Sequence, residues 1–125
     1  MNLIISNSSS QPIYEQIVEQ IKNMIITKEL KEGDVLPSMR LLAKELHISV
    51  ITTKRAYEEL EREGFIASQT GRGSFVRPQN IEQIKELHLR EIEKKMEELI
   101  GVAKLSGIGL KELLEMLTIL YKGEE

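Results

Sequence analysis

Two short helical patterns, joined by a three-residue break and followed by a glycine-containing turn, occupy residues 37–77. Ser38 precedes the first pattern and Ser49 precedes the second. Both are typical N-cap residues, because a serine hydroxyl can accept a hydrogen bond from an N–H that the first helical turn leaves unpaired. The break is His47-Ile48-Ser49. Two short helices joined by a tight turn form the unit that places its second helix in a DNA major groove, so this region predicts a helix-turn-helix.

Apolar spacing predicts one buried side on each of three helices. Isoleucine recurs at every fourth position across residues 12–27, where Pro12 suits the first helical turn. In the third helix, apolar residues follow i, i+3, i+4, i+7 spacing from Thr53 to Leu60. The side chains expected in the core are Ile13, Ile17, Val18, Ile21, Met24 and Ile25 in the first helix, Leu41, Leu42 and Leu46 in the second, and Thr53, Ala56, Tyr57 and Leu60 in the third.

A β-hairpin is expected after the third helix, which Gly64 is expected to end. Residues 65–69 and 74–77 are rich in β-compatible side chains, and the turn Thr70-Gly71-Arg72-Gly73 lies between them. Residues 78–80 then indicate a hinge, because Pro78 cannot continue a strand. A hairpin that follows a helix-turn-helix predicts the wing of a winged helix.

The residues after the hinge carry two helical apolar stripes, interrupted at Gly107-Ile108-Gly109. A segment this short cannot enclose a metabolite in a core of its own, but pairing with a second copy would bury both stripes. We therefore expect a homodimer, with any small-molecule effector bound between subunits or between the winged helix and the tail. The expected dimerisation residues are Ile92, Met96, Leu99, Ala103, Leu110, Leu113, Leu114, Leu117, Leu120 and Tyr121. The predicted fold is mainly α with a small β-wing: a winged helix-turn-helix DNA-binding domain at 1–78 and a two-helix C-terminal dimerisation tail at 79–125.

The distribution of charge favours DNA as a partner, although the net charge of −3 alone argues against it. Residues 46–57 and 64–77 together contain four Lys or Arg residues and no Asp or Glu. A surface built from these two windows would be electropositive on an otherwise acidic molecule. The alternative without a function is that these cations are ordinary solvated surface groups. For Arg55 a further alternative is that it points toward the first helix instead of DNA.

Each part of the predicted winged helix suggests its own DNA contacts. The first residues of a recognition helix reach base edges, where hydroxyls and cations bond bases or phosphates and apolar groups contact a thymine methyl. Arg40 is expected near the sugar-phosphate backbone, and the glycine-flanked Arg72 can enter a minor groove. The predicted DNA-contacting residues are Ser38, Arg40, Ser49, Val50, Ile51, Thr52, Lys54, Arg55, Thr70, Gly71, Arg72 and Gly73.

Several segments resemble the GntR family of bacterial repressors in order and spacing. They are Pro12-Ile13-Tyr14, Leu36-Pro37-Ser38-Met39-Arg40-Leu41-Leu42-Ala43, Thr52-Thr53-Lys54-Arg55-Ala56-Tyr57-Glu58-Glu59-Leu60, Gly64-Phe65-Ile66 and Gly71-Arg72-Gly73-Ser74-Phe75-Val76. The short two-helix tail looks like that of the YtrA-type subfamily. The resemblance implies operator binding as a dimer, autoregulation and frequent control of transporter genes. By position, it also places Ser38, Arg40, Ser49, Thr52, Lys54, Arg72 and Gly73 where the family touches DNA.

The chain departs from the family at two positions of the recognition helix. Many relatives carry Arg or Asn where this chain has Val50 and Ile51. Apolar side chains cannot make the same hydrogen bonds to bases, so operator recognition is expected to depend more on apolar contacts and DNA shape.

The sequence carries no recognisable catalytic constellation. It has no cysteine, and its two histidines, His47 and His88, have no neighbour at metal-ligand spacing. No nucleophile–base pair or carboxylate dyad is present. We therefore predict no enzymatic activity, no cofactor and no metal.

Localisation and the alternative function follow from weaker signals. No apolar run approaches the ~20 residues that span a bilayer, and the first residues lack the pattern of a secretory signal. A cytoplasmic protein with no membrane partner is the expectation. The alternative to a DNA-binding regulator is a winged-helix protein-interaction module, although such a module has no need for two acid-free basic windows.

Overall fold

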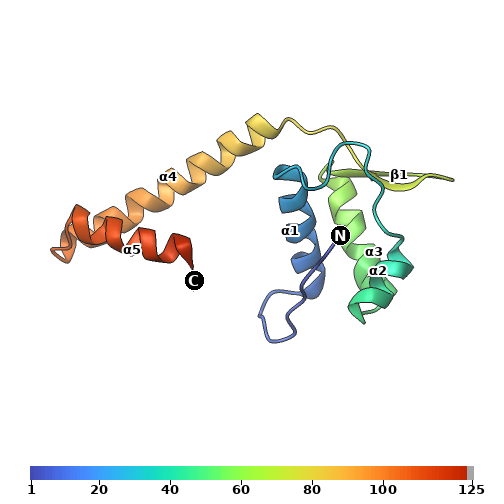
Figure 1. Cartoon of the computed structure of the whole chain (residues 1–125), viewed down its shortest axis with the longest axis horizontal. Helices are drawn as coiled ribbons and strands as arrows, with labels where there is room; N and C mark the ends of the chain where they lie inside the picture. Colours follow the sequence, from blue (N-terminus) through green and yellow to red (C-terminus); the bar gives the residue numbers. More distant parts are fainter. Residues whose placement is uncertain (124–125) are drawn as a thin grey trace. The chain divides into compact units, whose positions relative to one another are not determined.

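A computed structural model describes residues 1–123, and its contacts divide the chain into two units, Met1–Ile81 and Glu82–Glu125 (Figure 1). The helices are α1, Ile13–Ile26; α2, Met39–Leu46; α3, Val50–Arg62; α4, Ile81–Leu105; and α5, Leu110–Lys122. The strands are β1, Ile66–Gln69, and β2, Gly73–Val76. A mainly helical chain with one small antiparallel sheet confirms the predicted fold class. The expected boundary after residue 78 falls in the segment between β2 and α4.

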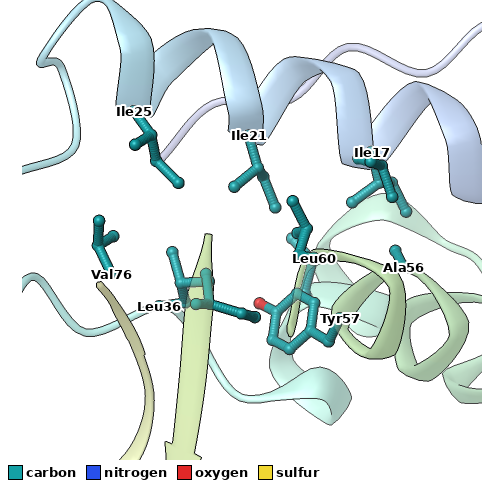
Figure 2. Close-up of a cluster of buried hydrophobic side chains, with 11 residues drawn as sticks. Ile17, Ile21, Ile25, Leu36, Ala56, Tyr57, Leu60 and Val76 are labelled. Carbon is teal, nitrogen blue, oxygen red and sulfur yellow. The ribbon is translucent and has the colours of Figure 1, made fainter. Parts of the chain in front are cut away.

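The core of the first unit lies between α1 and α3. Figure 2 shows Ile17 and Ile21 of α1 facing Ala56 and Leu60 of α3, and all four side chains are fully buried. The remaining members of the cluster are Val18, Ile25, Leu36, Leu42, Tyr57, Ile66 and Val76. The four-residue isoleucine repeat and the apolar stripe of α3 therefore form one core, as predicted.

Helix α2 contradicts one prediction about the core. Leu41 is 47% exposed, although the sequence analysis assigned it to the buried side. The residues that α2 buries fully or partly follow i, i+3, i+4, i+7 spacing: Met39, Leu42, Ala43 and Leu46. An eight-residue helix presents one narrow stripe to its neighbours, and Leu41 lies outside that stripe.

Two serine caps and one left-handed residue define the turn between α2 and α3. Ser38 Oγ accepts a hydrogen bond from the Leu41 N–H at 3.1 Å, and Ser49 Oγ accepts one from the Thr52 N–H at 3.2 Å. His47 ends α2 with φ 56°, which reverses the chain. Both predicted N-caps are thus confirmed.

Buried hydroxyl groups connect α3 to the start of α2. The Thr53 hydroxyl donates to Met39 O at 3.0 Å and to Val50 O at 2.8 Å. The Tyr57 hydroxyl donates to Pro37 O at 2.7 Å. Because Thr53 and Tyr57 are both buried, these bonds satisfy polar groups that water cannot reach and fix the angle between the two helices.

The hairpin joins the core through its residues nearest the helices. β1 and β2 pair antiparallel, with Ile66 opposite Val76 and Gln69 opposite Gly73. Ile66 and Val76 are buried, whereas the turn residues 70–73 are exposed. Val35 adds an isolated antiparallel bridge to Phe75, which ties the segment before α2 to the wing.

The first residues of the chain are bound by two glutamines of α1. Gln16 accepts from the Ser6 N–H and donates to Ser6 O and Gln11 O, each at 2.9 Å. Gln20 accepts from the Ile4 N–H at 2.9 Å and donates to Ile4 O at 2.7 Å. These bonds join residues up to sixteen positions apart, so no local sequence pattern predicts them.

The second unit consists of two helices joined at the predicted break. α4 ends at Leu105 and α5 begins at Leu110, with Gly107-Ile108-Gly109 between them. Most of its apolar side chains are exposed, in contrast to those of the first unit. Across residues 1–123, no helix combines the length and apolar character needed to cross a membrane.

Candidate nucleic-acid interface

The N-terminal turn of α3 presents a mixed apolar and hydroxyl surface. Val50 is 44% exposed and Ile51 is 79% exposed, so neither contributes much to the core. The hydroxyls of Ser49 and Thr52 are 2.9 Å apart and lie at the same helix end. Exposed apolar groups beside hydroxyls and helical N–H groups can contact thymine methyls, bases and phosphates together.

Lys54 supplies positive charge one turn further along α3. Its Nζ is 4.0 Å from Glu58 Oε1, and both side chains are more than half exposed. An exposed pair at this distance contributes little stability, so Lys54 can exchange Glu58 for a phosphate at small cost.

Arg40 is exposed in the first turn of α2, where the sequence analysis placed it. Thr53 and Met39 connect this helix end to the start of α3 by a hydrogen bond. Arg40 is therefore carried on the same rigid helix pair as Ser49 and the rest of the α3 N-terminus.

The hairpin tip carries a single cation between two glycines with positive φ. Gly71 has φ 84° and Gly73 has φ 82°, a conformation that side chains with a Cβ rarely adopt. The Arg72 N–H donates to Gln69 O at 2.9 Å and closes the turn. The Arg72 guanidinium lies over the Phe75 ring, with Cζ 3.8 Å from the ring centroid. Arg77, the other cation of this window, lies at the base of the hairpin beside Gly64.

Arg55 was expected either to contact DNA or to point toward the first helix, and the structure shows a contact with the first helix that leaves the side chain exposed. Its guanidinium Cζ is 3.8 Å from the centroid of the Tyr14 ring on α1, yet the side chain is exposed. The guanidinium therefore contacts the first helix on one face and remains accessible to solvent on the other. Sequence reasoning missed Tyr14 and Phe75 as partners of site arginines, although both belong to the segments that carried the family resemblance.

The tail displays an apolar groove between α4 and α5 of about 380 Å³. Ten of its eleven lining residues are apolar, and they include most of the expected dimerisation residues. The expected residues that line it are Ile92, Met96, Leu99, Leu110, Leu113, Leu114, Leu117 and Leu120. Ala103 is only 3% exposed, so its side chain already packs inside the chain and is not available to a partner. Tyr121 is 89% exposed and lies outside the groove lining.

No metal site accompanies these surfaces in residues 1–123. No group of three or more His, Asp or Glu side chains there is arranged to hold a metal ion. His47 lies in the turn after α2, and His88 is exposed on α4.

A helix-turn-helix with a β-hairpin wing defines a winged-helix DNA-binding domain. The family described as "Bacterial regulatory proteins, gntR family" matches residues 13–76, which cover this domain. The chain belongs to the GntR family, and it is a transcriptional regulator rather than an enzyme.

Two relatives share nearly the whole length of the chain. The HTH-type transcriptional repressor YtrA of Bacillus subtilis is 38% identical over 107 residues, covering 86% of this chain and 82% of YtrA. The HTH-type transcriptional regulator YhcF of the same organism is 33% identical over 117 residues, covering 92% and 94%. The GntR-family transcription factor YtrA from Sulfolobus acidocaldarius has a TM-score of 0.59 and 36% identity, covering 74% of this chain and 97% of that one. The likeness extends into the tail and places the chain among the YtrA-type members.

Proposed function

We propose that this chain is a cytoplasmic repressor that binds an inverted-repeat operator as a homodimer. The observation that carries the proposal is the exposed N-terminus of α3, where apolar side chains, hydroxyls and a cation meet on a capped helix end. The repressor activity named for Bacillus subtilis YtrA supports the sign of regulation. Control of transporter genes is part of the same proposal and follows from the family resemblance.

Each part of the domain has a distinct role in the proposed complex. Ser49 to Lys54 lie in the major groove, where Val50 and Ile51 contact thymine methyls and the hydroxyls bond bases or phosphates. Arg40 binds the sugar-phosphate backbone or a base beside it. Arg72 reaches the minor groove, and the glycines beside it and Thr70 let the backbone approach the duplex.

The homodimer is supported by the apolar side chains that the tail leaves exposed. A groove of this size lined by leucine, isoleucine and methionine is unfavourable in water, and a second copy would cover it. A twofold dimer would also place two recognition helices about one DNA turn apart, which requires an inverted-repeat site. An effector, where one exists, would bind at this interface or beside it.

Selection of bound duplexes from a random DNA pool tests the proposal directly. We expect an enriched sequence with twofold symmetry and half-sites separated by about 10 base pairs. Affinity measured by fluorescence anisotropy should fall linearly with salt concentration on logarithmic axes, because phosphate contacts release counterions. A chain that enriches no sequence and retards no DNA at low salt would instead support the protein-interaction alternative.

Arg40→Ala tests the assignment of one residue. We expect operator affinity to fall by about 1–3 kcal/mol if Arg40 makes a bidentate contact with a base. Arg90→Ala is the matched control, since Arg90 lies on α4 of the tail and pairs with Glu86 of the same helix. Equal affinities for the two variants would remove Arg40 from the interface.

A further inference from the structure

Two aromatic rings lie under Arg55 and Arg72, two of the three arginines predicted to contact DNA. Arg55 Cζ is 3.8 Å from the centroid of Tyr14, and Arg72 Cζ is 3.8 Å from the centroid of Phe75. These distances correspond to direct contact between the planar guanidinium and the ring, well within the ~6 Å range of cation–π attraction. The two pairs form independently, because one joins α1 to α3 and the other lies within the hairpin.

We propose that Tyr14 and Phe75 are positioning residues that hold the guanidinium groups of Arg55 and Arg72 for contact with DNA phosphates. The inference rests on the proposed function. A guanidinium that stacks through its face keeps its N–H donors directed outward in its own plane. The ring therefore restricts the arginine without consuming the donors that a phosphate needs.

The position of Arg55 on α3 supports this role. Ile51 precedes it by four residues, so the two side chains share one face of the helix. Ile51 is 79% exposed and belongs to the turn proposed to enter the major groove. Tyr14 is half-buried, and its hydroxyl donates to Glu15 at 3.1 Å, so its ring is fixed while Arg55 covers it.

The carboxylate one turn after Arg55 is already occupied. Arg62 Nε donates to Glu59 at 3.0 Å, and a second bond joins the same two side chains. The Arg62 bond lowers the pKa of Glu59, so this carboxylate stays charged and paired. Arg55 can therefore bind a phosphate without first breaking an ion pair with Glu59.

The position of Phe75 fixes the ring beneath Arg72. Its backbone pairs with Ala67 in the hairpin and forms the bridge to Val35. Phe75 is half-buried, whereas Arg72 is exposed at the hairpin tip between two glycines. The stack thus compensates for the freedom of the turn and reduces the number of conformations that Arg72 loses when it binds.

The third cation–ring pair of the winged helix provides a contrast. Lys22 Nζ lies 5.4 Å from the Phe65 centroid and also forms an ion pair with Glu63. Its charge is neutralised within the protein, and the ammonium lacks the planar donor edge of arginine. Phe65 is therefore the matched control ring.

A double-mutant cycle with the selected operator duplex tests the inference. Tyr14→Leu should weaken binding about two- to fivefold, and Tyr14→Phe should leave it unchanged because the ring remains. In the Arg55→Ala background, Tyr14→Leu should have no further effect. In the same way, Phe75→Leu should weaken binding in the unaltered chain and should have no further effect in the Arg72→Ala background. The control Phe65→Leu should leave the operator affinity of the folded protein unchanged.

Two further measurements distinguish positioning of Arg55 from a purely structural role of Tyr14: the salt dependence of Arg55→Ala and the affinity of Arg55→Lys. Arg55→Ala should reduce the slope of log affinity against log salt by about one, the value for one phosphate. Arg55→Lys keeps the charge but not the planar face, so it should lose about as much affinity as Tyr14→Leu. This variant leaves α1 intact and decides the question even if Tyr14→Leu does not fold.

Three results would overturn the inference while the proposed function stands. The first is an equal loss of operator affinity from Tyr14→Leu in the unaltered chain and in the Arg55→Ala variant. The second is an unchanged affinity of Tyr14→Leu, and the third is an unchanged affinity of Arg55→Lys. Failure of the unaltered chain to bind any duplex would instead remove the proposed function and this inference together.

Discussion

The two units of this chain use apolar residues in opposite ways. In the first unit, apolar side chains of α1, α3 and the hairpin are buried in one cluster, including Ile17, Ile21 and Leu60 with no exposure. In the second, α4 and α5 bury Ala103 among their described side chains, while leucines such as Leu110 and Leu120 stay more than 70% exposed. One unit has a core that is complete within the chain, and the other leaves most of its apolar side chains exposed.

This difference is consistent with separate roles for the two units, proposed here as DNA binding by the first and dimerisation by the second. The winged helix holds the side chains proposed to contact DNA in fixed positions, because its own core determines their geometry. In the proposed homodimer, a second copy covers the exposed apolar faces of α4 and α5, which would couple operator binding to dimerisation. Four predictions test this contrast, from the largest expected effect to the smallest.

Leu117→Glu should have the largest effect. Leu117 is half-exposed and lines the groove of the tail, where a buried charge would oppose pairing. We expect a monomer in sedimentation equilibrium and a loss of operator affinity of roughly 100-fold or more, because the second half-site is no longer linked. Leu105→Glu is the control, since Leu105 is 91% exposed and lies outside the groove lining. A dimeric Leu117→Glu with normal affinity would contradict the role of the groove.

Leu60→Ala should strongly destabilise the first unit. The side chain has no exposed area and lies against α1 in the core (Figure 2). We expect the free energy of unfolding in urea, followed by circular dichroism, to fall by about 2–5 kcal/mol. Leu105→Ala in the tail should change it by no more than about 0.5 kcal/mol. Similar losses at both positions would show that the contrast between the units is false.

Tyr57→Phe should have an intermediate effect that depends on pH. The hydroxyl donates to Pro37 O at 2.7 Å, and its removal leaves a partly buried carbonyl without that donor. We expect a loss of about 1–2 kcal/mol in the free energy of unfolding at neutral pH. A change below a few tenths of a kcal/mol would mean that water replaces the missing donor.

The alkaline behaviour of the same variant provides a second measurement. Burial raises the pKa of the Tyr57 phenol above its ordinary value of 10.0, and the charge of Glu45 adds to this. The folded state thus holds the proton more tightly than the unfolded state. Its contribution to stability is complete below about pH 10 and is lost as the pH rises further. The stability of Tyr57→Phe should therefore decline less steeply above pH 10 than that of the unaltered chain.

Arg90→Ala should have the smallest effect. Arg90 Nε is 3.9 Å from Glu86 Oε1 across one turn of α4, both side chains are more than 60% exposed, and neither residue lines the groove of the tail. Exposed pairs at this spacing contribute about 0.3–0.5 kcal/mol, so thermal unfolding should hardly change. A loss above about 1 kcal/mol would mean that this part of α4 is buried in the assembled protein.

The sequence alone was sufficient for the elements whose causes are local. Serine caps, the isoleucine repeat and the glycines of the hairpin turn act within a few residues, and the structure contains the elements they predict. The order of these elements also indicated the family that the comparisons then established. The residues assigned to DNA contact remain predictions, since their partner is outside the chain.

Tertiary structure decided the features that join distant segments. Leu41 is exposed because the packing of α2 selects one narrow stripe, and Gln16 binds residues that only the folded chain brings near it. The stacking of Arg55 on Tyr14 likewise joins two helices separated by many residues. Local patterns specify which segments become helices or strands, because those preferences depend on neighbouring residues. Side-chain partners depend on the three-dimensional arrangement of whole elements, so only the folded structure could supply them.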